Sequence, residues 1–165
     1  RIGATTAQVS DLLSFEFNQA SNFQGVNQQN HVGSFGQGRF FIGDIEVSED
    51  SDGNVIINYG GSRRFFELQP DGTYSSLVGD SASLTKNSNY RLEAKDGTAT
   101  VFSLGGKFLF TEDTNGNEVR ANYTGQQLTR LEFSTGDFID YTYNTQGRIA
   151  TATAQSMASH VLPSF

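Results

Sequence analysis

The fold is decided by residues 106–154, which read as three staggered lines: GKFLFTEDTNGNEVRANYT (106–124), GQQLTRLEFSTGDFIDYTYNT (125–145) and QGRIATATA (146–154). Phe108, Leu128 and Ile149 stand at equivalent places in the three lines, and Tyr123 and Tyr143 recur at the same interval. Each full line predicts an apolar strand, a glycine turn and a second strand that ends on tyrosine. Such a β-hairpin cannot bury its apolar face alone, so the period predicts hairpins stacked side by side.

The residues before the repeat predict more strands of the same kind. Turn signals, several of them Asp-Gly pairs, recur at short, regular intervals between segments of alternating apolar and polar side chains. Near the N-terminus, Leu13, Phe15 and Phe17 alternate with polar residues and predict a strand, whereas residues 18–34 are rich in Asn, Gln and Gly and predict a loop. The sequence therefore predicts an all-β fold, an antiparallel meander of short strands.

The repeat motif resembles a known family. Residues 143–149 (YNTQGRI) are similar to the tyrosine–aspartate line of RHS/YD-repeat proteins, roughly Y-D-x-x-G-R-L, with matches at Tyr143, Gly147 and Arg148. Ile149 stands where the family has Leu, and Asn144 stands where it has Asp. Arg148 is expected to lie against a tyrosine of the next strand or to pair with a nearby carboxylate, and a carboxylate ligand is the alternative.

Other segments carry the same resemblance in the order that the family has them. Residues 33–38 (GSFGQG), 63–74 with their PDGTY ending, and 113–117 (DTNGN) are similar to segments at the start of RHS regions, so the match covers residues 33–154. The resemblance implies a twisted, spiralling YD-repeat-type sheet and a non-enzymatic structural role. Together with the patterns at the two ends, it predicts an N-terminal strand and loop (1–34), the repeat-like sheet (35–154) and an apolar tail (155–165).

Composition limits the partners. The 165 residues carry a net charge of −7, which argues against nucleic acid and anionic membranes, since both attract a basic face. There is no cysteine, and no apolar run approaches a membrane span. The first residue is Arg1 rather than Met, which indicates a processed chain or a piece of a longer one. The resemblance implies a secreted, extracellular or cell-surface protein of bacterial type.

Candidates for chemistry are few. Asp50, Asp52 and Asn54 offer side-chain oxygens to Ca²⁺, but no bidentate glutamate follows at the right distance, so a turn is the favoured interpretation. No catalytic residue, metal site or cofactor site is predicted. The six tyrosines could stack on sugar rings, which would suit a glycan-binding adhesin; the periodic tyrosines favour a structural role instead.

Both ends of the chain carry strand-like or apolar segments, which suggests contacts between copies. A head-to-tail contact between residues 5–17 and 148–165 would be heterologous and would build a filament. We therefore expect self-assembly into an extracellular filament; the alternatives are the glycan-binding adhesin and a fragment of a larger toxin-encapsulating RHS shell. The residues expected at the contact between copies are Leu13, Phe15, Phe17, Ile149, Val161, Leu162 and Phe165.

Overall fold

The computed structural model describes residues 32–37, 41–59 and 62–156, which form strands and turns apart from one short 3-10 helix. A small hairpin consists of β1 (Val32–Gly33) and β2 (Gly36–Gln37), and helix η1 (Ile42–Asp44) follows it. A four-stranded sheet contains β3 (Glu46–Glu49), β4 (Val55–Tyr59), β5 (Ser62–Leu68) and β6 (Tyr74–Ser76). An eight-stranded sheet contains β7 (Ser83–Lys86), β8 (Tyr90–Glu93), β9 (Ala99–Phe102), β10 (Phe108–Glu112), β11 (Glu118–Thr124), β12 (Gln127–Phe133), β13 (Phe138–Tyr143) and β14 (Ile149–Gln155).

Both large sheets are meanders in which each strand pairs antiparallel with its neighbour in sequence, so the predicted all-β meander is confirmed. The described strands nevertheless form two meanders rather than one sheet, and neither sheet is closed or curled. After β6 the chain leaves the small sheet through the exposed Leu77 and Val78 and enters the large sheet as β7. Two sheets that each have one apolar face bury more of it by packing together than one open sheet can.

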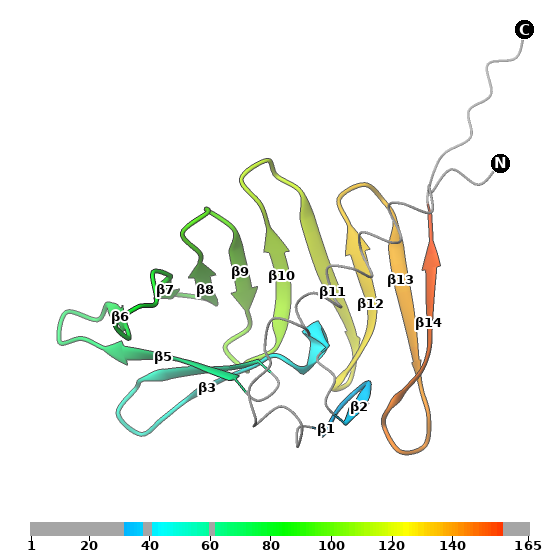
Figure 1. Cartoon of the computed structure of the whole chain (residues 1–165), viewed down its shortest axis with the longest axis horizontal. Helices are drawn as coiled ribbons and strands as arrows, with labels where there is room; N and C mark the ends of the chain where they lie inside the picture. The colour runs from blue at the N-terminus through cyan, green and yellow to red at the C-terminus, as the bar shows by residue number, and fades with distance from the viewer. Residues whose placement is uncertain (1–31, 38–40, 60–61, 157–165) are drawn as a thin grey trace, which may run out of the picture.

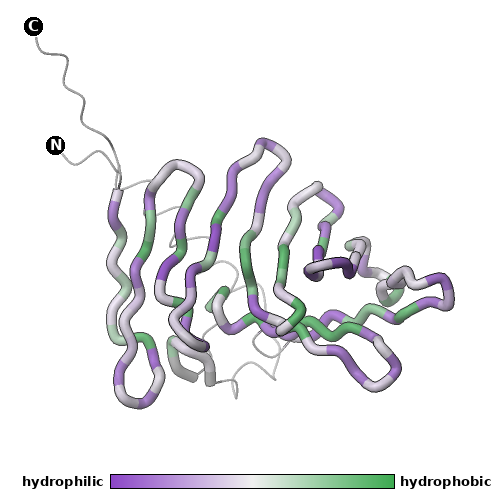
Figure 2. The backbone as a smooth tube through the Cα atoms, turned by 180° about the vertical axis from the view of Figure 1, so that it is seen from behind, coloured by the Kyte–Doolittle hydropathy of each residue, from purple (hydrophilic) through white to green (hydrophobic). Residues whose placement is uncertain are grey.

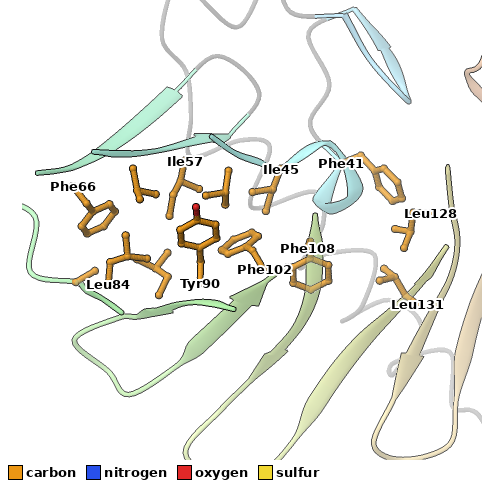
Figure 3. Packing of buried hydrophobic residues seen from close by; sticks show 14 of the residues in the cluster. Phe41, Ile45, Ile57, Phe66, Leu84, Tyr90, Phe102, Phe108, Leu128 and Leu131 are labelled. Carbon is orange, nitrogen blue, oxygen red and sulfur yellow. The ribbon is translucent and has the colours of Figure 1, made fainter. Parts of the chain in front are cut away.

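The two sheets pack face to face across an aromatic core. Figure 3 shows Ile57 and Phe66 of the small sheet directed towards Tyr90, Phe102 and Phe108 of the large one. All of these except Tyr90, which is 3% exposed, have no exposed surface. Complete burial of a phenylalanine contributes about 1.5–3 kcal/mol, so this contact holds the β7–β10 end of the large sheet firmly. Figure 2 shows the hydrophobic stretches concentrated where the two sheets meet.

Phe41, which precedes η1, extends the core towards the other end of the large sheet. Its ring packs edge-on against Tyr141 of β13, with the centroids 4.9 Å apart, and against Phe35 at 5.1 Å. Leu128 and Leu131 lie beside it (Figure 3). We call the side of the eight-stranded sheet that bears Phe102, Leu131 and Tyr141 the inner face, and the opposite side the outer face.

The period predicted from the sequence coincides with successive hairpins of the large sheet. The first unit is β10 and β11, the second is β12 and β13, and β14 stands in the place of the first strand of a third unit. A register shift occurs next to Tyr123 in the first unit and next to Tyr143 in the second. Figure 1 shows β7 to β14 side by side in chain order, with β14 at one end of the long axis of the molecule.

Residues 1–31 and 157–165, which hold the predicted N-terminal strand and most of the apolar tail, lie outside the described residues. Within the described ranges, no helix is long and apolar enough to cross a membrane.

Candidate functional site at the β14 edge

Strand β14 ends the eight-stranded sheet, and its sequence IATATAQ contains neither a charged residue nor a proline. It pairs with β13 along one edge, from Tyr143 opposite Ile149 to Phe138 opposite Gln155. No described strand pairs with the other edge, and six of its seven residues are exposed. An edge strand presents unpaired N–H and C=O groups, so β14 offers a template on which one more strand can add.

A side-chain contact and a backbone hydrogen bond hold β14 in place without covering its length. The hydroxyls of Thr142 and Thr151 are 2.6 Å apart across the β13–β14 pair. At the start of β14, the Ile149 N–H donates to the Ser34 carbonyl at 2.8 Å. The carboxylate of Asp44 holds Ser34 by accepting from its N–H at 2.9 Å and from its hydroxyl at 2.5 Å. The turn between β1 and β2 therefore caps the first residue of β14.

The two periodic tyrosines make equivalent hydrogen bonds. The Tyr123 hydroxyl donates to the Phe108 carbonyl at 2.9 Å, and the Tyr143 hydroxyl donates to the Leu128 carbonyl at 2.7 Å. Each tyrosine thus reaches from the end of the second strand of its unit to the first apolar residue of the first strand. Burial, together with the neighbouring Tyr143 and Asp44, raises the pKa of Tyr123 to about 12, and burial followed by Asp44 raises the pKa of Tyr143. Both hydroxyls therefore remain protonated donors at neutral pH.

The turn that leads into β14 carries the other motif residues. The Asn144 side-chain oxygen accepts from the N–H groups of Gln146 and Arg148, and Gly147 takes a positive φ of 74°. The Arg148 side chain is exposed, and within the described residues it forms neither an ion pair nor a stacking contact with an aromatic ring. The expected contact with a tyrosine or carboxylate is therefore not found there, because the arginine points from a turn rather than from the paired part of a strand.

The weak calcium candidates form a turn network. One oxygen of Asp50 accepts from the N–H groups of Asp52 and Asn54, both at 2.9 Å, and the other accepts from the Asn54 amide at 3.0 Å. These hydrogen bonds, above all that from Asn54, lower the pKa of Asp50. The Asn54 oxygen in turn accepts from the Leu68 N–H at 2.9 Å. Across the described parts of the chain, no group of three or more His, Cys, Asp or Glu residues could hold a metal ion.

The outer face carries arginines that lie over phenylalanines and pair with carboxylates. Arg130 lies over Phe138, with its guanidinium carbon 3.8 Å from the ring centroid, and donates two hydrogen bonds to Asp140 at 2.6 and 2.9 Å. Arg120 stacks on Phe110 at 4.9 Å in the same manner. The contact with Asp140 raises the pKa of Arg130 and lowers that of the carboxyl. These cations are occupied by partners within the sheet rather than available to an anionic ligand.

The tyrosines do not form an exposed aromatic platform. Tyr90 and Tyr141 are 3% and 4% exposed, and the others, Tyr59, Tyr74, Tyr123 and Tyr143, are half-buried. Because paired residues of neighbouring strands share a face, the register places Tyr123 and Tyr143 on the inner face with Leu128 and Ile149. A sugar ring needs an exposed aromatic face to stack on, so the described tyrosines give the glycan-binding alternative little support.

Of the residues expected at the contact between copies, the structure describes Ile149, which is half-buried at the start of β14. The others, Leu13, Phe15, Phe17, Val161, Leu162 and Phe165, lie outside the described residues. Sequence reasoning did not single out Ser34 and Thr151, which cap and brace β14. The sequence does contain a signal for this edge, a seven-residue run without a charged residue or a proline. Native edge strands usually carry a charged residue or a proline.

Comparison with known proteins adds no family. No family model matches the chain, and no curated protein matches it either. The resemblance to RHS/YD-repeat proteins therefore depends on the motif residues themselves.

Proposed function

We propose that this chain is a structural, non-enzymatic β-sheet module of RHS/YD-repeat type that assembles head-to-tail into an extracellular filament. The contact joins the open edge of β14 to a strand of the next copy. The observation that carries the proposal is β14 itself, a seven-residue strand at the edge of the described sheet that has neither charge nor proline and exposes six of its seven residues. Soluble proteins usually protect such edges with lysine, proline, a bulge or a covering segment.

The shape of the molecule suits a filament. Figure 1 places β14 at one end of the long axis and the β5–β6 hairpin of the small sheet at the other. The link between β6 and β7, next to this hairpin, exposes two adjacent apolar residues, Leu77 at 60% and Val78 at 107%. A contact between the β14 edge and a different segment of the next copy is heterologous, and it propagates unless its rotation closes a ring. The spiralling sheet of the family would then arise from added strands, since strands twist successively in one sense.

One alternative has an observation in its favour. Because β14 corresponds to the first strand of a third repeat, the next strand of a longer RHS chain could cover the same edge, as in a fragment of a larger shell. The two possibilities differ in the behaviour of the isolated chain. A filament-forming module assembles without further sequence, whereas a fragment presents an edge with no specific partner.

Substitution of an exposed edge residue tests the proposal. Thr153 pairs opposite Asp140, so Thr153→Lys adds a charge to the edge that the β13–β14 pair can tolerate. We expect wild-type chains to form uniform fibres in negative-stain electron microscopy and Thr153→Lys chains to remain single 18.0 kDa particles in solution. The matched control is Thr124→Lys, at an exposed threonine of the interior strand β11, which should still form fibres. Single particles for the wild type, or fibres of unchanged yield for Thr153→Lys, would contradict the proposal.

A further inference from the structure

The repeat defines what a strand added to β14 must look like. In both complete units the second strand runs antiparallel to the first, carries alternating apolar residues on the inner face and ends on an aromatic residue beside the next turn. That aromatic residue is Tyr123 in the first unit and Tyr143 in the second, and each bonds the carbonyl of the residue equivalent to Ile149. The strand that completes the third unit should therefore end on an aromatic side chain next to Ile149.

Resting on the proposed function, we propose that residues 11–17 of a second copy of this chain form that strand. Their sequence, DLLSFEF, carries Leu13, Phe15 and Phe17 at alternate positions. This is the spacing of the apolar residues of β13, FIDYTY, which ends on Tyr143. Phe17 takes the place of the terminal tyrosine and lacks only its hydroxyl.

The repeat also sets the register of the added strand. In the second unit, Ile139 lies opposite Leu131. Ala152 stands as far after Leu131 in the sequence as Ile149 stands after Leu128, so it is the equivalent of Leu131 in the third unit. If the incoming strand pairs with β14 as β13 pairs with β12, Leu13 lies opposite Ala152. The neighbouring position then brings Ser14 opposite Thr151, on the outer face.

The side chains of β14 leave room for this partner. On the inner face β14 carries Ala152 and Ala154, both exposed, where β12 has Leu131 and Phe133. Small side chains beside the edge accommodate the larger leucine and phenylalanines of an incoming strand. We assign the strand to a second copy on the basis of the proposed assembly, and cysteine cross-linking distinguishes a second copy from the same chain as its source.

Cysteine cross-linking tests both the register and the source of the strand. The natural chain contains no cysteine, so introduced cysteines are the only ones present. Full-length Ser14→Cys chains carrying a mass tag are mixed with untagged Thr151→Cys chains and oxidised under assembly conditions. We expect the tagged–untagged disulfide at about fivefold or greater yield over a mixture of Ser14→Cys with Thr85→Cys on β7, because only the first pair has the required Cβ separation. A chain carrying both Ser14→Cys and Thr151→Cys should give cross-linked oligomers rather than an oxidised monomer.

The outcomes separate this inference from the proposed function. Fibres without preferential Ser14–Thr151 cross-linking would overturn the register while leaving assembly intact. An oxidised monomer from the double variant, with no fibres, would overturn the second copy as the source and the filament with it. Equal yields from the two mixtures in the absence of fibres would also overturn both.

A gain-of-function variant provides a second measurement. Phe17→Tyr supplies the hydroxyl that Tyr123 and Tyr143 use in the other units, within reach of the Ile149 carbonyl in the proposed register. One added hydrogen bond should lower the critical concentration for assembly roughly two- to tenfold. Leu12→Tyr, on the opposite side of the same segment, is the control and should produce no such change. An unchanged or raised critical concentration for Phe17→Tyr would contradict the proposed pairing.

Discussion

The two edge strands of the eight-stranded sheet, β7 and β14, differ in length, charge and coverage. At one end, β7 has four residues, carries Lys86 and lies beneath the small sheet, where Lys86 bonds to Glu49 of β3 at 2.6 and 2.8 Å. At the other end, β14 has seven residues and no charge. Short length, a lysine and a covering sheet are established protections against edge-to-edge pairing. Among the described residues, the small sheet therefore covers the β7 end of the large sheet, whereas no strand pairs with the free side of β14.

The first prediction compares a turn glycine that contacts the small sheet with a turn glycine beside β14, and it carries the largest expected effect. Gly106 and Gly147 both have positive φ, 85° and 74°. A Cβ on Gly106 would lie 2.1 Å from the Val47 carbonyl oxygen of the small sheet, whereas one on Gly147 would meet nothing within 4 Å. We expect Gly147→Ala to lower the free energy of unfolding by about 1–2 kcal/mol through backbone strain, and Gly106→Ala by at least about 2 kcal/mol more.

Urea denaturation of the two glycine variants under conditions that keep the chain monomeric measures the difference. Equal losses would show that the small sheet does not press on the β9–β10 turn as tightly as the structure has it. The Val47 N–H also donates to the Gly106 carbonyl at 3.0 Å, so Gly106→Ala should disturb a contact between the sheets.

The second prediction concerns the tyrosines of the repeat. Tyr143→Phe removes the hydroxyl that donates to the Leu128 carbonyl, and Tyr123→Phe removes the equivalent donor to Phe108. Each should cost about 1 kcal/mol of unfolding free energy, the net contribution of one hydrogen bond. Similar losses in the two variants, measured by denaturation, would support equivalent roles. A loss of stability in only one variant would show that the two tyrosines are not equivalent, and the strand proposed for the third unit is inferred from that equivalence.

The third prediction is the smallest and tests the protected end through pH. Hydrogen bonds from Lys86 and then Tyr90 lower the pKa of Glu49 below its ordinary value of 4.5. A carboxyl with a lowered pKa in the folded state adds stability above its unfolded pKa and loses it as pH falls through the folded pKa. Because these side chains are about a third exposed, the contribution should stay below about 1 kcal/mol.

Unfolding free energies of wild type and Glu49→Gln measured between about pH 7 and pH 3 test this interaction. The variant should be less stable at neutral pH, and the difference should shrink on acidification. A difference that is independent of pH would show that the carboxylate charge does not tie the two sheets together.

Local patterns in the sequence predicted much of the meander. The Asp-Gly turns at Gly53, Gly72 and Gly97 adopt the positive φ that favours glycine. The spacing of Phe108 and Leu128 matches the first strands of successive hairpins. A hairpin is a local structure, so the positions of its turn residues in the sequence define the length of its strands.

The division into two sheets could not be predicted in this way. It depends on contacts between distant residues. Examples are the isolated antiparallel β-bridge between the backbones of Glu46 and Lys107 and the hydrogen bond that the Tyr90 hydroxyl donates to Glu49 at 2.8 Å. Nothing in the spacing of those residues indicates that they meet, because packing between sheets leaves no period in the sequence. The candidate site was partly predictable: Ile149 belonged to a visible motif, whereas the cap that Ser34 places on it arises only from the fold.

Hydrogen–deuterium exchange of assembled against dilute, unassembled protein tests the central claim most directly. The account predicts that amides of residues 150–155 in β14 become strongly protected on assembly, because their open edge gains a partner strand. Amides of residues 83–86 in β7 should exchange alike in both samples. Unchanged exchange in β14, or protection that appears at β7 instead, would contradict the claim that the uncharged edge of β14 joins the copies.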